Sequence, residues 1–108
     1  QFAASGTIGT YTLAQSTTAP DGFAYSLKLD TTTADASPAG TDNLTIRYKI
    51  EGQDLQRFKF GTASAESMTL SFWCRSNKTG DIQVNLRNMD AGRIIAAAVS
   101  INSANTWE

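Results

Sequence analysis

The sequence contains no histidine and only one cysteine among its 108 residues. A Ser-His-Asp or Cys-His catalytic centre needs an imidazole base, so the chain cannot build either of these centres. Zinc and haem sites usually need several histidine or cysteine ligands, which the chain also lacks. A single cysteine cannot form a disulfide within the chain. The fold must therefore be stabilised by packing, within the chain or against neighbouring molecules.

Charge is sparse as well. Charged residues make up 18% of the chain, and the formal net charge is -1. A nucleic-acid surface needs a clustered positive field, whereas Lys and Arg are scattered singly along this sequence. No segment approaches the roughly 20 apolar residues of a membrane span. We therefore expect neither a nucleic-acid partner nor a membrane partner.

The sequence is rich instead in Thr, Ser, Ala, Asn and Gly, and apolar and polar residues alternate with a period of two. Five segments show this alternation clearly and are named below. Two weaker candidates are TIGTYTLAQ, a weaker strand, and QRFKF, a short strand or an irregular crossing. About seven short strands at roughly ten-residue spacing are typical of an antiparallel β-sandwich. The main predicted strands, with their core-facing residues, are FAYSLKL (Phe23, Tyr25, Leu27, Leu29), LTIRYKI (Leu44, Ile46, Tyr48, Ile50), MTLSFWCR (Met68, Leu70, Phe72, Cys74), DIQVNLR (Ile82, Val84, Leu86) and IIAAAVSI (Ile95, Ala97, Val99, Ile101).

Turn residues separate these strands. SNKTGD predicts a hairpin between MTLSFWCR and DIQVNLR, in which Gly80 is free to adopt a positive φ. NMDAGR predicts a second hairpin, whose four-residue loop places Leu86 opposite Ile95. The polar stretch from Asp30 to Asn43 contains a proline and a glycine, and we expect it to be a loop between sheets or an excursion from them.

The last residues, INSANTWE, form a predicted turn followed by Trp107, where another strand is expected to begin. A sheet that ended one residue into a strand would leave an unpaired edge. We therefore expect one jelly-roll-like β-sandwich domain over residues 1–108, as a fragment of a longer chain that lacks roughly two or three C-terminal strands.

The segments QRFKFGTASAESMTLSFWCRSNKTGDIQVNL and INSANTWE resemble a known domain pattern. They are similar to jelly-roll, carbohydrate-binding-module-like domains of marine bacteriophage structural proteins, especially tail fibres and other virion appendages. In that pattern a QRFKFGTASA run leads to LSFWVRSNKTG, then a charged hairpin and a strand ending near SAANTWE. The resemblance extends from Tyr48 to Glu108. It implies a virion location, further strands after the Trp-Glu pair, and a packing role for Cys74, where the pattern commonly has Val.

Two neighbouring side chains are candidates for function, and strand parity separates them. Cys74 is expected to face inward, where a thiol acts as a small, unreactive hydrophobe. Trp73 is expected to lie on the opposite face, where an aromatic ring among amide and guanidinium groups can stack on a sugar or anchor a protein interface. The third interpretation is that a missing strand, a loop or a neighbouring subunit covers this face. The residues predicted to share the face with Trp73 are Arg75, Gln83, Asn85 and Arg87.

Asp30, Asp35 and Asp42 are candidate ligands for a structural calcium ion. Calcium takes about six to eight oxygen ligands, however, and the spacing of these residues matches no calcium-binding loop. We favour solvated turn residues instead, since Asp is a common turn former. We predict no catalytic residues, no metal site and no other cofactor.

These observations predict a non-enzymatic structural or attachment module of a phage virion appendage, such as a tail or head fibre. Such a module would display loops rigidly and assemble with copies of itself and with other virion proteins. The alternative is a carbohydrate-binding module that recognises host-surface or polysaccharide glycans through the Trp73 face. A third hypothesis is an extracellular adhesin domain of a bacterium. Fold alone does not decide among them, because one fold serves many functions.

Overall fold

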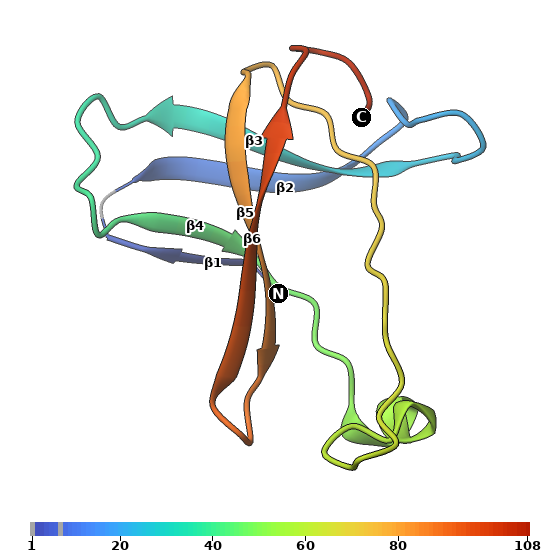
Figure 1. Ribbon diagram of the computed structural model, residues 1–108. Coiled ribbons are helices and arrows are strands. Elements are labelled where there is room, and N and C mark those ends of the chain that lie inside the picture. Colours follow the sequence, from blue (N-terminus) through green and yellow to red (C-terminus); the bar gives the residue numbers. More distant parts are fainter. Residues whose placement is uncertain (1, 7) are drawn as a thin grey trace. The chain divides into compact units, whose positions relative to one another are not determined.

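The computed structural model describes residues 2–6 and 8–108 (Figure 1). Strands account for 39% of the chain, and the described part contains one short helix, so the predicted strand-rich character is confirmed. The elements are β1 (Phe2–Ser5), β2 (Gly9–Ser16), β3 (Ser26–Ala34), β4 (Asn43–Ile46), the 3-10 helix η1 (Gly52–Phe58), β5 (Gly80–Asn88) and β6 (Arg93–Ile101).

The strands form three two-stranded antiparallel sheets, β1–β4, β2–β3 and β5–β6. They belong to two compact units. The first unit spans Gln1–Thr69 and contains the first two sheets and η1, and the second spans Leu70–Glu108 and contains β5–β6. An isolated two-stranded sheet is only marginally stable in water. Each sheet therefore needs further packing, within the chain or against neighbouring molecules, to be stable.

In the first unit, β2 pairs with β3 from Gly9–Ala34 to Ser16–Ser26, with a register shift between Thr10 and Tyr11. The weaker predicted strand is thus confirmed as β2. The loop predicted to start at Asp30 was wrong over its first residues, since β3 continues to Ala34. The run of threonines there has no apolar alternation, but β-branched residues suit a strand. The Oγ1 atoms of Thr10 and Thr32 share a hydrogen bond of 2.6 Å across the pair.

The strand predicted from Phe23 begins three residues later, at Ser26. The N–H of Phe23 instead donates to the carbonyl of Pro20 at 3.1 Å, which closes a β-turn over Pro-Asp-Gly-Phe. Gly22 has φ +88° in this turn. Only glycine adopts that value at low cost. The Pro-Asp-Gly triplet is therefore a turn signal, and the strand begins only after this turn.

The remainder of the first unit differs more from the prediction. β4 ends at Ile46, so the predicted strand LTIRYKI is shortened, and its partner β1 was not predicted at all. QRFKF falls largely in η1 rather than in a strand. The N–H of Lys59 donates to the carbonyl of Gln56 at 3.0 Å, the spacing of a 3-10 turn. A five-residue alternation is too short to separate a strand from a helical turn.

In the second unit, β5 and β6 pair without a register shift, from Gly80–Ile101 to Asn88–Arg93. Leu86 lies opposite Ile95, so the predicted four-residue hairpin loop is confirmed. The Oδ1 atom of Asn88 accepts the N–H groups of Asp90 and Ala91, both at 3.0 Å, and orders this loop. Gly80 has φ +133°, the positive value that the sequence predicted.

The other predicted hairpin was wrong, because residues 68–75 form no strand with β5. Cys74 pairs instead with Glu108. The N–H of Cys74 donates to the carbonyl of Glu108 at 2.9 Å, and the N–H of Glu108 donates to the carbonyl of Cys74 at 3.0 Å. Mutual exchange of both bonds is the arrangement of an antiparallel pair. The turn at residues 76–79 thus leads into β5, but the segment before the turn does not pair with that strand.

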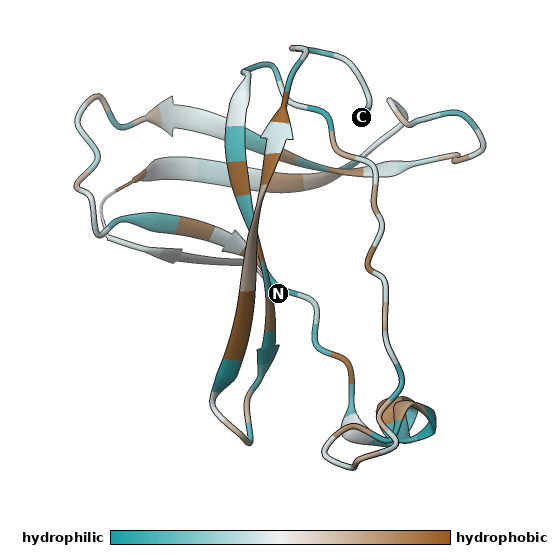
Figure 2. Cartoon of the chain, viewed as in Figure 1, coloured by the Kyte–Doolittle hydropathy of each residue, from teal (hydrophilic) through white to brown (hydrophobic). Residues whose placement is uncertain are grey.

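Very little of the apolar surface is buried. Among the described residues, the buried side chains are Ile8 and Ile101, with 8% and 7% of their surface exposed, and Pro20. The predicted core residues Phe23, Tyr25 and Leu27 are exposed. Colouring by hydropathy shows apolar bands that alternate with polar ones along β5, and a nearly continuous apolar run along β6 (Figure 2).

Candidate functional site

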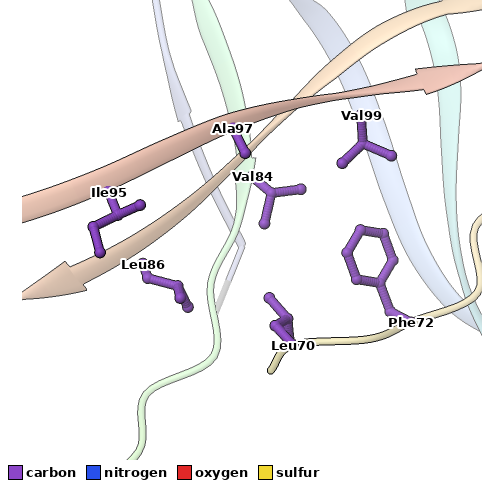
Figure 3. Close-up of a pocket in the computed structure, with 7 residues that line it drawn as sticks. All are labelled: Leu70, Phe72, Val84, Leu86, Ile95, Ala97 and Val99. Carbon is purple, nitrogen blue, oxygen red and sulfur yellow. The ribbon is translucent and has the colours of Figure 1, made fainter. Parts of the chain in front are cut away.

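The second unit contains an apolar hollow of about 190 Å³ (Figure 3). Every residue that lines it belongs to the set predicted to face inward. The lining offers no polar side chain to orient a sugar or another polar ligand, which binding sites for such molecules require. We therefore interpret the hollow as part of a packing layer. Its lining residues are Leu70, Phe72, Val84, Leu86, Ile95, Ala97 and Val99.

The hollow shows how residues 70–73 lie against β5–β6. Leu70 and Phe72 face the apolar side of the sheet across the hollow (Figure 3). These residues thus form a second layer, not a third strand of the same sheet. Side chains alternate along an extended chain. Ser71 and Trp73 are consequently directed away from the hollow, and 56% of the Trp73 surface is exposed.

The five predicted site residues therefore divide between two surfaces. Gln83 and Asn85 alternate with Val84 along β5, so they lie on the side of the sheet that faces away from the hollow. Trp73 lies on the far side of the other layer. The structure does not bring Trp73 together with Gln83, Asn85 and Arg87. Equal parity places residues on one face only when their segments are strands of the same sheet, and the segment with Trp73 is not a strand of the β5–β6 sheet.

Arg75 connects its segment to the turn that follows β6, a contact that the sequence did not indicate. Its Nε donates a hydrogen bond of 2.8 Å to the carbonyl of Asn105, and the N–H of Asn105 donates to the carbonyl of Ser76 at 2.6 Å. In an antiparallel pair, the residues that flank Cys74 and Glu108 also oppose each other, which places Arg75 opposite Trp107. Trp107 therefore belongs to the Trp73 face. Its face could not be predicted from the sequence, because a single residue after a turn shows no alternation.

On the outer face of β5, each predicted polar site residue lies opposite a small or apolar residue of β6. Gln83 pairs with Ala98, Asn85 with Ala96, and Arg87 with Ile94. The small alanines leave the amides and the guanidinium exposed to solvent. This row can donate and accept hydrogen bonds, but it has no aromatic ring on which a sugar could stack.

A carboxylate holds the turn that follows β6. Glu108 Oε1 accepts the N–H of Ser103 at 2.7 Å, and Oε2 accepts the N–H and the Nδ2 of Asn102 at 3.0 and 3.1 Å. The hydrogen bond from the backbone N–H of Asn102 lowers the pKa of Glu108, and a smaller desolvation opposes it. The bonds from the Ser103 N–H and the Asn102 side chain lower this pKa further.

This arrangement predicts a pH dependence for the turn. Because the pKa of Glu108 is lower in the folded state than in the unfolded state, its stabilising effect is complete above its usual pKa of 4.5. The effect is lost as the pH falls through the lowered value. We expect Glu108→Gln to lower the melting temperature at pH 7, because a Gln Nε2 cannot accept these N–H groups.

The difference between Glu108→Gln and the native protein should shrink as the pH falls from 7 to 3 in a series of thermal unfolding scans. Glu66→Gln is the matched control, since exposed Glu66 lies 3.9 Å from Lys59 Nζ in an exposed ion pair of little energetic weight. A difference that stays constant across this pH range would show that the Glu108 carboxylate does not hold the turn.

The three candidate calcium ligands do not form one cluster. Asp30 pairs with Lys28 Nζ at 3.0 Å, Asp35 accepts the N–H of Ser37 at 2.9 Å, and Asp42 accepts the N–H of Ala39 at 2.9 Å. Within residues 2–6 and 8–108, no three His, Cys, Asp or Glu side chains are grouped so that they could hold a metal ion. Asp35 and Asp42 act in local turns, as the sequence suggested, whereas Asp30 lies within β3.

No helix in the described part of the chain has the length and apolar character needed to cross a membrane. Cys74, predicted to be buried, is half-buried, and its contribution to the fold is the backbone pair with Glu108.

Comparison with protein-family models, with curated proteins and with solved structures found no match to this chain. The resemblance to virion-appendage domains therefore remains a hypothesis that depends on the sequence motifs alone.

Proposed function

We propose that the chain is a non-enzymatic structural or attachment module of a phage virion appendage, a tail or head fibre. It acts by rigid display and by assembly with copies of itself and other virion proteins. One observation supports this proposal above the others. Apolar residues make up 41% of the sequence, yet most of the large ones in the described part are exposed. Extended exposed apolar surface is typical of proteins that bind other proteins.

We propose further that the strands belong to a jelly-roll-like β-sandwich. Two sheets support this fold with one apolar face each: β5–β6 with the face that lines the hollow, and β2–β3 with the face that carries Leu13 opposite Leu29. Sheets with one apolar face are stable when such faces stack about 10 Å apart. The strand-rich content and the antiparallel pairing agree with this fold.

The alternative function is a carbohydrate-binding module that uses the Trp73 face. The observation in its favour is the exposed ring of Trp73, together with Arg75 and Trp107 on the same face. Tryptophan rings stack on the apolar faces of sugar rings, and guanidinium groups bind sugar hydroxyls. Gln83, Asn85 and Arg87 no longer contribute to this face, which weakens the alternative.

Trp73→Ala tests the two functions against each other. We expect neither the native protein nor Trp73→Ala to be retained on a glycan array, because the proposed role is assembly. Met89→Ala is the control, since Met89 is an exposed apolar residue in the β5–β6 loop. If the native protein and Met89→Ala bound a glycan and Trp73→Ala lost at least about tenfold in affinity, carbohydrate recognition would be the function.

A further inference from the structure

β6 has one edge without a partner strand. In the described part of the chain, it pairs only with β5. From Ile94 to Ile101 it carries no charge and no proline, and its register with β5 contains no shift. Edge strands of soluble proteins normally carry charges, prolines or bulges that prevent pairing with other chains. A strand that is apolar on both faces is instead typical of the middle of a sheet.

Other strands of the protein have the edge features that β6 lacks. β5 carries Asp81 and Arg87 near its two ends, and polar residues alternate between them (Figure 2). β2 contains the register shift after Thr10, and β3 carries the ion pair between Lys28 and Asp30. β1 and β4 are only four residues long, and such short edge strands give little template for pairing. Among the strands of eight or nine residues, β6 is therefore the one with an unprotected edge.

We propose that the open edge of β6 pairs with β6 of a second copy of this chain, antiparallel and about a two-fold axis. The two hairpins then form one four-stranded sheet in the order β5-β6-β6-β5. A two-fold axis makes both copies use the same surface, so the edge of β6 in each copy serves as the partner for the edge of β6 in the other. This inference rests on the assembly role proposed above and identifies the surface through which assembly occurs.

The sequence of β6 is complementary to itself in this arrangement. With the axis at Ala97, Ile95 of one copy lies opposite Val99 of the other, and Arg93 lies opposite Ile101. Between Ile95 and Val99, apolar residues thus face apolar residues on the hollow side. Arg93 lies opposite an uncharged residue, so like charges do not oppose each other. The small Ala96 and Ala98 oppose each other on the outer face, where they leave no steric obstacle.

The pairing also satisfies groups that the single copy leaves to solvent. Every second residue of β6 directs its N–H and C=O toward the open edge, and a partner strand provides hydrogen bonds for them. Ile94 and Ile95, with 57% and 71% of their surface exposed, would lie opposite Ser100 and Val99 of the partner strand.

The double variant Ala96→Lys/Ala98→Lys tests the proposal. In the proposed pairing it places lysines opposite lysines in two cross-strand pairs on the outer face. We expect the dissociation constant of the dimer, measured by sedimentation equilibrium, to rise roughly tenfold or more. Gln83→Lys/Asn85→Lys is the matched control. It adds the same charge to the same face at the β5 positions paired with Ala98 and Ala96, and should leave the dimer intact.

Charge complementation separates lost pairing from misfolding. A mixture of Ala96→Lys/Ala98→Lys with Ala96→Glu/Ala98→Glu places Lys opposite Glu, so we expect the mixed dimer to recover. A native oligomer that the lysine pair leaves unchanged would overturn this inference and keep the assembly role. A native monomer whose β6 amides all resist hydrogen exchange would show that a strand of the same chain covers this edge. A native monomer whose edge amides exchange rapidly would overturn both proposals.

Discussion

Gly9→Ala should remove most of the stability of the β2–β3 sheet. Gly9 begins β2 with φ +86°, and a Cβ at this position would lie 2.0 Å from the carbonyl oxygen of Thr33 and 3.1 Å from the N of Asp35. The nearest obstacle is backbone of the paired strand, which cannot rotate away as a flexible side chain can. The strain of a left-handed residue adds about 1–2 kcal/mol to this clash. We expect the free energy of unfolding to fall by about 3 kcal/mol or more.

Gly22→Ala is the control that separates the clash from the φ strain. Gly22 has φ +88°, nearly the value of Gly9, but nothing lies within 4 Å of the position that its Cβ would occupy. This variant should lose only about 1 kcal/mol, the cost of the backbone conformation alone. Urea unfolding of the two variants and the native protein measures both losses. Equal losses would mean that Gly9 is not held against Thr33.

Val84→Asp should be comparably damaging in the second unit. Val84 is half-buried at the apolar hollow, and no positively charged side chain lines that hollow. A carboxylate enclosed there by covering layers would have no partner for its charge. We expect a loss of about 3 kcal/mol or more in the free energy of unfolding, together with a loss of the β-sheet signal in circular dichroism.

The neighbouring residue provides the matched control. Asn85→Asp adds the same charge one position along β5, on the outer face, and should change stability by at most about 0.5 kcal/mol. If Val84→Asp proved no more harmful than Asn85→Asp, the hollow would be a solvated surface. The assignment of this face to the interior of a sandwich would then fail.

The part of the fold that could be predicted is the part that local rules determine. In β5, strict alternation assigned the faces, and a four-residue loop set the register with β6, so the pairing of Leu86 with Ile95 followed from the sequence. β2 was weaker but recognisable. The threonine-rich half of β3 was missed, because a strand with polar residues on both faces shows no alternation.

Alternation predicts the face of a residue but not its neighbour. It correctly grouped Leu70 and Phe72 with the apolar residues of β5 and β6, as the lining of the hollow shows. It could not determine whether residues 68–75 lie beside β5 or across from it. That choice depends on long-range pairing, such as the bonds between Cys74 and Glu108.

The same ambiguity in strand pairing affected the predicted site. Trp73 and Arg75 remain on one face, whereas Gln83, Asn85 and Arg87 are on another, because the two segments are not strands of one sheet. Trp107 could be placed on the Trp73 face only from the observed backbone hydrogen bonds between Cys74 and Glu108. Residue types and parity were therefore sufficient to select exposed candidates, but not to assemble them into one site.

The most direct test of the account is the molar mass of the native chain in solution, measured by light scattering over a range of concentrations. Pairing of two copies through β6 predicts twice 11.6 kDa at high concentration, a decline toward 11.6 kDa on dilution, and a melting temperature that rises with concentration. A mass of 11.6 kDa and a constant melting temperature at every concentration would contradict it.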